Sequence, residues 1–370
     1  MKIRTVKTYI VPPELSVTAW GPGNPWVLVR LETDSGIVGW GQTYTFRDRE
    51  QAIALAVHKL ALILDGFYPF DVKGFMAKAL DTITGPGGGS ETAAAAAGIE
   101  IALWDIVGKA QNAPVHQLLG GACHDRVGVY ANCWSHVPRS PQELGAFALE
   151  QVNQGFKAVK VYPFLYDVTV DDGIACLAAV REAVGSDVSL FVDMWSRVRD
   201  EDLPRIIDAL HAQWVTWFED PADATEVETL ALIRRQSQLP VISGETLYLK
   251  QDFRRLVEHK AADSLNPDVT LCGMLGIKEI AAMADASSVS VSVHNNNTMT
   301  IGLAAALHTA AVIPNVRLVE YFPRFVAGSN AFSTFSTEMD DEGCILLPND
   351  PGIGVTVDEA TLEAMEYKPV

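Results

Sequence analysis

The stretch VSLFVDMWSRVRDEDLPRIIDALHAQWVTWFED, residues 188–220, contains two short apolar runs with a helical stretch between them. The first run ends at Asp193 and the second at Glu219. Valine-rich strands that alternate with helices in this way are typical of a parallel sheet. The pattern recurs along the chain and gives eight strand candidates: VGVYANC, KAVKVY, VSLFVD, VTWFED, LPVISGE, ADSLNP, VSVSVH and VRLVE. Eight such units over roughly two hundred residues predict a closed α/β barrel.

The residues before this region have a different organisation. WVLVRLET and IVGWGQTYTF are joined by Asp34-Ser35-Gly36 and predict a β-hairpin, and helical patterns follow it. We therefore predict an N-terminal α+β domain over residues 1–123 and a barrel domain over residues 124–322. Residues 323–370 have the pattern of loop and strand, and we expect them to pack back on the first domain.

Polar residues at the ends of the strands indicate where the functional site lies. From the third strand candidate onward, each one ends in an acid or an imidazole, at successive spacings of 26, 26, 23, 26 and 26 residues. One βα unit of a TIM barrel has about this length, because eight units take roughly 250 residues. We therefore expect six groups at one level of the barrel mouth, where barrel enzymes keep their chemistry: Asp193, Glu219, Glu245, Asp268, His294 and Glu320.

Three of these carboxylates predict a metal site. Any one of them could be a turn residue or a helix N-cap, but that reading does not explain six groups in phase. Asp193, Glu219 and Glu245 come from adjacent strands, so without a cation they would repel one another. Oxygen ligands of this kind suit Mg²⁺, and we predict one Mg²⁺ per subunit.

The remaining groups predict acid–base chemistry. Asp268 and His294 come from neighbouring strands, and a carboxylate that accepts the imidazole N–H fixes its tautomer and raises its basicity. Lys160 and Tyr162 point to one side at the end of the second strand, since strand side chains alternate. Glu320 could hydrogen-bond a substrate oxygen if protonated, or it could pair with Lys160.

Composition narrows the class of partner. The formal net charge of −18 argues against a nucleic-acid partner, which needs clustered Lys and Arg. The five cysteines form no C-x-x-C pair and are scattered, which suggests free thiols in a reducing compartment. We found no long apolar segment typical of a signal peptide or a membrane span. These features predict a cytoplasmic protein without a membrane partner.

The chain resembles the mandelate racemase branch of the enolase superfamily over almost its whole length. The resemblance rests on GIVGWGQ, GIEIALWDIVGKAQNAPVHQLLGG, the strand ends FVD, WFEDP, ISGE, NPDVTLCGM and VSVHNN, and the late segment DPGIGV. It implies an α+β capping domain over a modified TIM barrel of the (β/α)₇β type, and a homo-oligomer. It also implies Mg²⁺ ligation by the three carboxylates named above, a His294–Asp268 dyad and an electrophilic Glu320. The implied shared step is abstraction of the proton α to a substrate carboxylate.

One position departs from the family pattern and bears on the reaction. The family has K-x-K on the second strand, where Lys160 matches the first lysine and Tyr162 replaces the second. A phenol, with an ordinary pKa of roughly 10, is a poor base at neutral pH but a reasonable donor. With His294 as the one strong base, β-elimination of water is favoured over proton transfer on both faces. The prediction is an acid-sugar dehydratase that forms a 2-keto-3-deoxy acid.

Other reactions are compatible with the same fold. One alternative is a racemase or epimerase that uses Tyr162 and His294, and another is a lactone-forming cycloisomerase. A metal-dependent hydrolase is a more distant alternative. The predicted substrate is a small carboxylate, namely a sugar acid. We predict that its contacts include amides after His294, an aromatic residue after Asp193 and aromatic residues of the capping domain: Asn295, Asn296, Trp195, Tyr44 and Trp20.

Overall fold

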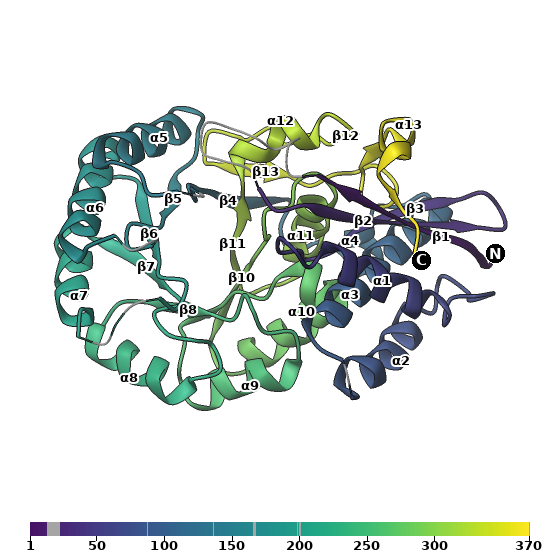
Figure 1. Cartoon of the computed structure of the whole chain (residues 1–370), viewed down its shortest axis with the longest axis horizontal. Helices are drawn as coiled ribbons and strands as arrows, with labels where there is room; N and C mark the ends of the chain where they lie inside the picture. The colour runs from purple at the N-terminus through teal and green to yellow at the C-terminus, as the bar shows by residue number, and fades with distance from the viewer. Residues whose placement is uncertain are drawn as a thin grey trace.

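The computed structural model describes residues 1–12, 23–86, 88–135, 137–165, 168–197, 199 and 201–369. Its N-terminal part is an antiparallel sheet with the strand order β15-β1-β2-β3, covered by three helices (Figure 1). The strands are β1 (Ile3–Val11), β2 (Trp26–Thr33), β3 (Val38–Gln42) and β15 (Glu366–Tyr367). The helices are α1 (Glu50–Ala61), α2 (Val72–Thr84) and α3 (Ser90–Gln111), followed by the short α4 (Val115–Leu118).

Eight parallel strands form the second part of the molecule. Their order runs from β11 down to β4, and β11 pairs with β4, so the sheet closes into a barrel. The strands are β4 (Arg126–Asn132), β5 (Ala158–Val161), β6 (Ser189–Asp193), β7 (Val215–Glu219), β8 (Val241–Ser243), β9 (Ser264–Leu265), β10 (Ser290–Val293) and β11 (Val316–Tyr321). Each of them lies within one of the eight predicted strands or extends beyond it by one residue.

A helix follows each of the first seven barrel strands. These helices are α5 (Pro141–Asn153), α6 (Val170–Val184), α7 (Leu203–Ala212), α8 (Val227–Ser237), α9 (Lys250–Glu258), α10 (Val269–Asp285) and α11 (Ile301–Ala311). Figure 1 shows α5 to α9 outside the ring of strands, while α10 and α11 lie on the side that faces the capping domain. The predicted (β/α)₇β barrel with an N-terminal capping domain is therefore confirmed.

The interior of the barrel has an aromatic floor. Tyr130, Phe191 and Trp217 are buried and pack together, with the Phe191 and Trp217 rings stacked at 4.6 Å between centroids. Each of these residues lies two positions before the last residue of its strand, so the side chain two positions later points to the same interior. The last residues of these strands therefore point into the barrel interior, directly above the three buried rings.

Helix α3 connects the capping domain to the barrel through a buried carboxylate. Glu100 accepts hydrogen bonds from the backbone N–H groups of Met274 (2.7 Å) and Leu275 (3.0 Å) and from the Trp104 indole (3.0 Å). Burial raises the pKa of Glu100 to about 7, although the three donors act in the opposite direction. Gly273 interrupts α10 with a φ of 73°, and a Cβ there would lie 2.1 Å from a Glu100 oxygen. Only glycine fits this contact between the domains.

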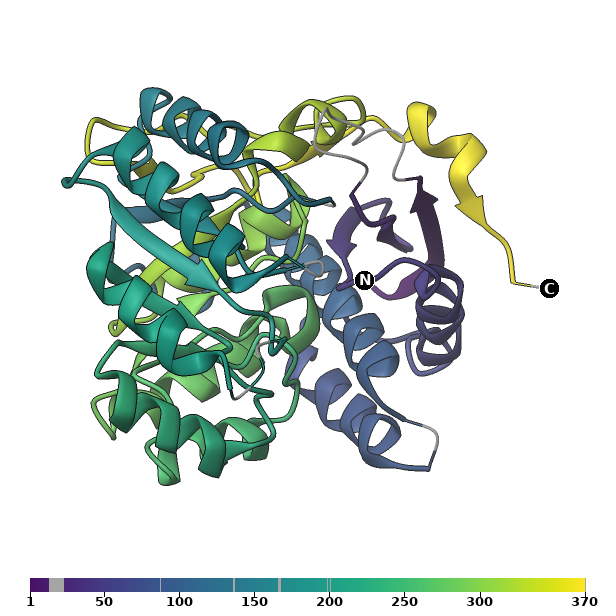
Figure 2. The ribbon, with the colours of Figure 1, turned by 60° about the vertical axis from the view of Figure 1, so that its left-hand side comes forward.

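The C-terminal segment lies against both domains (Figure 2). Strand β13 (Cys344–Leu346) pairs antiparallel with the start of β4, and β15 pairs with β1 of the capping sheet. Between them, the Ile353 N–H donates to the buried Asp105 carboxylate of α3 at 3.0 Å. The segment thus contacts the barrel through β13 and the capping sheet through β15.

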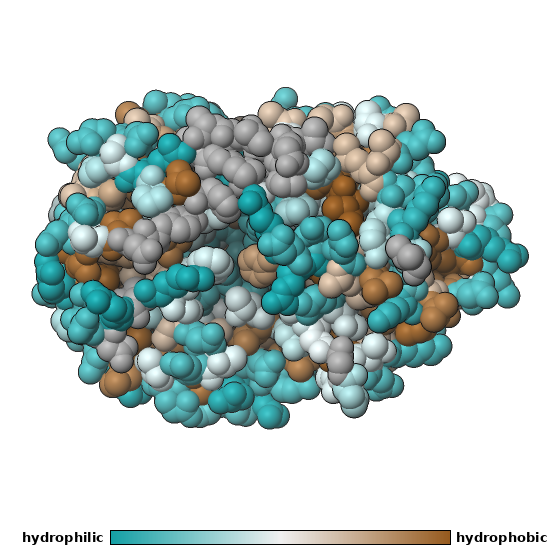
Figure 3. Space-filling model, viewed as in Figure 1, coloured by the Kyte–Doolittle hydropathy of each residue, from teal (hydrophilic) through white to brown (hydrophobic). Residues whose placement is uncertain are grey.

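The other helices and strands are short. The remaining elements are η2 (Pro323–Phe325), α12 (Val326–Ser329), β12 (Ser333–Thr334), β14 (Thr356–Val357), α13 (Glu359–Leu362) and η3 (Glu363–Met365). All five cysteines are free. Among the described residues, no helix has both the length and the apolar character needed to span a membrane. The face shown in Figure 3 is mostly hydrophilic, with scattered apolar residues, as the acidic composition leads one to expect.

Candidate active site

The carboxylates at the strand ends meet at one level above the aromatic floor. Asp193 and Glu219 are the last residues of β6 and β7 and lie opposite each other in the register of the sheet. Glu245 follows the end of β8 by two residues. All three side chains are buried. Parallel strands of similar length thus bring the three predicted metal-binding residues to the same mouth of the barrel.

A buried lysine joins several of these groups. The Lys160 Nζ atom lies 2.8 Å from a Glu219 oxygen, 2.8 Å from a Glu320 oxygen and 3.4 Å from an Asp193 oxygen. Its side chain is 0% exposed. Burial works to lower the pKa of Lys160, but Glu219 and Glu320 outweigh it and hold the pKa well above its usual value. The lysine is therefore a permanent cation within the ring of carboxylates.

The predicted imidazole–carboxylate pair is present as a hydrogen-bonded contact. The Asp268 Oδ2 atom lies 2.6 Å from His294 Nδ1 and also accepts the Asn296 N–H at 2.8 Å. The other Asp268 oxygen accepts from the Thr270 N–H, as befits the N-cap residue of α10. A carboxylate with these donors is itself an acceptor, so Nδ1 carries the hydrogen and Nε2 is left to exchange protons.

The Nε2 atom of His294 faces two further carboxylates. It lies 2.9 Å from Glu245 Oε2 and 3.0 Å from Glu320 Oε2. Burial works to lower the pKa of His294, but Glu320, Glu245 and Asp268 together raise it well above its usual value. Glu320 has the opposite shift, because Lys160 and His294 overcome burial and hold its pKa at about 2. Of the two roles expected for Glu320, the structure has the ion pair with Lys160.

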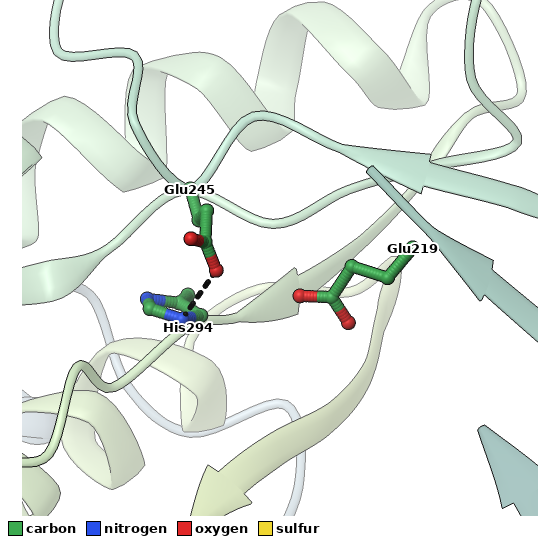
Figure 4. A group of neighbouring side chains, drawn as sticks. All are labelled: Glu219, Glu245 and His294. Atoms are coloured by element: carbon green, nitrogen blue, oxygen red, sulfur yellow. Dashed lines mark ion pairs between the residues drawn. The ribbon is translucent and has the colours of Figure 1, made fainter. Parts of the chain in front are cut away.

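Ligand atoms of Glu219, Glu245 and His294 lie within 4.8 Å of one another and could hold a metal ion (Figure 4). In Figure 4, a dashed line marks the ion pair between Glu245 and His294, and the Glu219 carboxylate points toward them from across the site. Asp193, the third predicted ligand, is linked to Glu219 through Lys160 instead. This cluster therefore contains two of the three predicted ligands, Glu219 and Glu245, and has the His294 imidazole in place of Asp193.

The chemistry of the donor set fits a divalent cation. Burial and repulsion from Glu219 raise the pKa of Asp193 well above its usual value, and burial also raises the pKa of Glu219. Two cationic groups, Lys160 and His294, are present in this ring, and it contains six buried carboxyl groups: Asp193, Glu219, Asp220, Glu245, Asp268 and Glu320. This excess of negative charge is what a hard cation with oxygen ligands offsets. In addition, the buried Asn266 Oδ1 atom has no hydrogen-bond partner among the described residues, and its amide nitrogen bonds Glu219.

Tyr162 directly follows β5, and its hydroxyl is held by a residue that we did not predict. The Asn132 amide nitrogen lies 2.8 Å from the Tyr162 oxygen and 2.6 Å from a Glu320 oxygen. The Lys160 ammonium lies 5.7 Å from the centre of the Tyr162 ring. Burial raises the pKa of Tyr162 well above its usual value, even though Lys160 works to lower it. The phenol is thus kept protonated at neutral pH.

The two amides predicted to bind substrate have protein partners. Both hydrogen-bonding groups of the Asn295 side chain are in use: its nitrogen donates to the carbonyls of Thr298 (2.9 Å) and Glu320 (3.3 Å), and its oxygen accepts from the Thr298 hydroxyl. The Asn296 nitrogen donates to the Thr45 carbonyl at 3.3 Å. These amides fasten the loop after β10 to β11 and to the capping domain. A contact of either amide with the substrate stays a prediction.

The aromatic residues predicted at the substrate lie beside the ring of carboxylates. Tyr44 and Trp195 line a cavity of about 370 Å³ with Phe46, Thr246 and Leu271. The Tyr44 hydroxyl is buried without a hydrogen-bond partner among the described residues, and burial together with the charges of nearby carboxylates raises its pKa. Trp195 and the residue after it have positive φ angles of 44° and 55°. The last predicted contact, Trp20, lies outside the described residues.

Three residues of the site escaped the sequence analysis, although each has a signal in the sequence. Asn132 lies two residues after Tyr130 in the first barrel strand and so shares its inward direction. Asp220 directly follows Glu219, and Asn266 follows the end of β9. Since Asn132 and Asn266 are uncharged, a search for ionisable groups at strand ends does not find them.

Comparison with known protein families agrees with this architecture. Residues 143–361 match the family model described as enolase C-terminal domain-like. Residues 1–120 match the N-terminal domain model of mandelate racemase and muconate lactonizing enzyme. The chain belongs to the mandelate racemase/muconate lactonizing enzyme branch of the enolase superfamily. The resemblance deduced from the motifs is thereby confirmed.

Individual relatives cover nearly the whole chain. A D-galactonate dehydratase from Klebsiella pneumoniae is 32% identical, over 97% of this chain and 93% of the relative. A D-xylonate dehydratase from Haloferax volcanii is 30% identical, over 92% of this chain and 85% of the relative. Among solved structures, an enolase from the environmental genome shotgun sequencing of the Sargasso Sea superposes with a TM-score of 0.92 at 26% identity, covering 99% of this chain and 97% of the other.

Proposed function

We propose that this protein is an acid-sugar dehydratase, which removes water from a sugar acid and forms a 2-keto-3-deoxy acid. The observation that carries the proposal is the His294–Asp268 pair, in which the 2.6 Å contact at Nδ1 leaves Nε2 as the atom that takes a proton. Relatives that are about 30% identical and named D-galactonate and D-xylonate dehydratase support the same reaction, and the chain is accordingly an enzyme of the hydro-lyase class.

The site is suited to Mg²⁺ as its cofactor. Asp193, Glu219 and Glu245 would hold the ion, because they lie at the ends of three adjacent strands and offer the oxygen ligands that a hard cation prefers. A bound Mg²⁺ supplies positive charge that stabilises negative charge developing on a substrate carboxylate. Lys160 supplies a second positive charge in the same ring, and this pair of charges lets an acidic protein bind an anionic substrate.

The side chains of the site then divide the proton chemistry between them. Asp268 holds the imidazole in one tautomer. A cation held by Glu245 would offset one of the charges that raise the pKa of His294, so that Nε2 would be free to take the proton from the carbon next to the substrate carboxylate. The bond from the next carbon to its hydroxyl breaks, and the imidazolium returns its proton to the departing hydroxyl, so that water leaves. The resulting enol rearranges to the 2-keto-3-deoxy acid, which balances the reaction without a further reagent.

We propose that the rest of the sugar acid occupies the cavity of about 370 Å³ beside the ring. Tyr44 supports this placement, since its buried hydroxyl lacks a protein partner among the described residues and can bond a substrate hydroxyl. Trp195 follows Asp193 by two residues and forms another wall of the cavity. A binding role for Trp20 stays a prediction.

Proton NMR in D₂O with Mg²⁺ tests the proposal directly. The wild-type protein is expected to convert at least one acid from a panel of aldonic, uronic and aldaric acids, with the appearance of a C3 methylene signal. His294→Asn should abolish the conversion, whereas His259→Asn should leave it unchanged, since His259 lies on the outer surface beside Glu228. Exchange of the α-proton without a methylene would contradict dehydration and favour the epimerase or cycloisomerase alternative.

A further inference from the structure

A continuous chain of side-chain contacts crosses one side of the barrel mouth. It starts at His294 after β10, passes Glu320 on β11 and Asn132 on β4, and ends at Tyr162 after β5. The successive distances are 3.0 Å from His294 Nε2 to Glu320 Oε2, 2.6 Å from Glu320 Oε1 to Asn132 Nδ2 and 2.8 Å from Asn132 Nδ2 to the Tyr162 hydroxyl. These four residues come from four strands that are consecutive in the closed barrel.

The backbone fixes the orientation of the amide in this chain. The Asn132 Oδ1 atom accepts the backbone N–H of Trp134 at 2.7 Å. A backbone N–H can only donate, so the atom facing it must be the amide oxygen, and the amide cannot be reversed. The NH₂ group therefore points to Glu320 and Tyr162, and its two hydrogens serve one partner each. Asn132 is 0% exposed, so water does not compete for these contacts.

This orientation decides what the phenol can do. Because Tyr162 accepts a hydrogen from Asn132, its own O–H bond points away from the amide and from Glu320. No other hydrogen bond involves this hydroxyl among the described residues. The neutral amide also has no proton to pass on, so Tyr162 cannot exchange protons with Glu320 or His294 through it.

We propose that Asn132 is a positioning residue that directs the Tyr162 O–H toward a substrate oxygen, so that the phenol serves as a hydrogen-bond donor and not as a second base. The inference rests on the proposed dehydratase function and adds the role of this side of the site. It accounts for the replacement of the second family lysine without loss of chemistry, since elimination needs one base whereas epimerisation needs two.

A double-mutant cycle with Tyr162→Phe and Asn132→Ala tests the proposal in the Mg²⁺-loaded protein. If Asn132 acts through the phenol, Tyr162→Phe lowers kcat/KM by roughly 10-fold or more, and Asn132→Ala adds much less in the Phe background than alone. If the loss of kcat/KM in the double variant equals the product of the two single losses, the residues act independently and the proposal is overturned. As a control, Asn315→Ala removes a half-buried amide just before β11, at the opposite end of the barrel, where it bonds the carbonyls of Ala281 and Val289. Its effect should be the same in both backgrounds.

Two further measurements separate this proposal from the proposed function. Asn132→Asp keeps the shape and the Trp134 contact but replaces the donor by an acceptor, which would attract the Tyr162 O–H. We expect it to lose at least as much activity as Tyr162→Phe, and wild-type activity in this variant would refute the proposal.

The same cycle can be read from urea unfolding, where no turnover is needed. The changes in the urea midpoint caused by Asn132→Ala and Tyr162→Phe are expected to be non-additive in the double variant. Additive changes would count against coupling between the two residues. A wild-type protein that acts on none of the acids would refute the dehydratase function, while the unfolding cycle would still report on the Asn132–Tyr162 contact. Epimerisation by the wild-type protein would refute both, since the phenol would then be the second base.

Discussion

Replacement of Lys160 by methionine should destabilise the metal-free protein strongly. The ammonium is fully buried and lies within 2.8–3.4 Å of three carboxylates, from Asp193, Glu219 and Glu320. Methionine preserves much of the volume but removes the charge, so these carboxylates are left buried without their partner. Removing one member of a buried ion pair costs about 3–5 kcal/mol.

This loss can be converted into a shift of the melting temperature. An unfolding entropy of about 2.1 cal/mol/K per residue gives roughly 0.8 kcal/mol/K for a chain of 370 residues that unfolds as one unit. We therefore expect Lys160→Met to lower Tm by about 4–6 °C in EDTA, as measured by scanning calorimetry. Mg²⁺ should restore part of the difference, because it supplies positive charge to the same carboxylates.

Lys250→Met is the matched control. Lys250 also pairs with a carboxylate, at 2.6 Å from Glu279, but both side chains are about half exposed. A surface pair of this kind contributes about 0–1 kcal/mol, so its loss should lower Tm by no more than about 1 °C. Equal shifts for the two variants, or no shift for Lys160→Met in EDTA, would refute the view that Lys160 stabilises the ring of carboxylates.

Three further predictions concern stability. Gly273→Ala should lower the free energy of unfolding by more than about 2 kcal/mol in urea titrations, because the positive φ and the contact with Glu100 exclude a Cβ, whereas Gly276→Ala should be neutral or stabilising. Burial lowers the pKa of His308 to about 3, so the unfolded chain binds a proton below about pH 6.5 that the folded chain does not. Stability should therefore fall by about 2.3 kcal/mol between pH 6.5 and 4.5 from this group, and His308→Gln should lack that component of the slope. An unchanged slope would contradict a neutral buried His308. Mg²⁺ at 100 times its Kd should raise the free energy of unfolding by about 2.7 kcal/mol, and no stabilisation by Mg²⁺ at any concentration would argue against the proposed metal site.

Much of the fold was accessible from the pattern of residues. All eight barrel strands were found because each is a short apolar run with turn signals at its ends, and burial on both faces leaves no polar alternation to confuse the pattern. The C-terminal segment was harder to place. Its β13 pairs with β4, which lies more than two hundred residues earlier in the chain. Its strands have only two or three residues each, too few for a sequence pattern to predict which strand they pair with.

The periodic spacing of ionisable groups carried the sequence analysis of the site. It placed Asp193, Glu219 and Glu245 at adjacent strand ends, and Asp268 beside His294, because a βα unit repeats at a nearly constant length. Regular spacing indicates a site when the residues are charged, because charged side chains are rarely buried unless they are paired.

What the chain order alone establishes is therefore the barrel, the level of its functional groups and the sign of their charge. Hydrogen-bond direction is set by three-dimensional contact: the Trp134 N–H orients Asn132, which orients the Tyr162 hydroxyl, and Lys160 pairs with Glu320 rather than leaving it free. The physical reason is range. Strand periodicity acts over a few residues and survives in the sequence, whereas a hydrogen bond depends on atoms that meet within about 3 Å only after the barrel has closed.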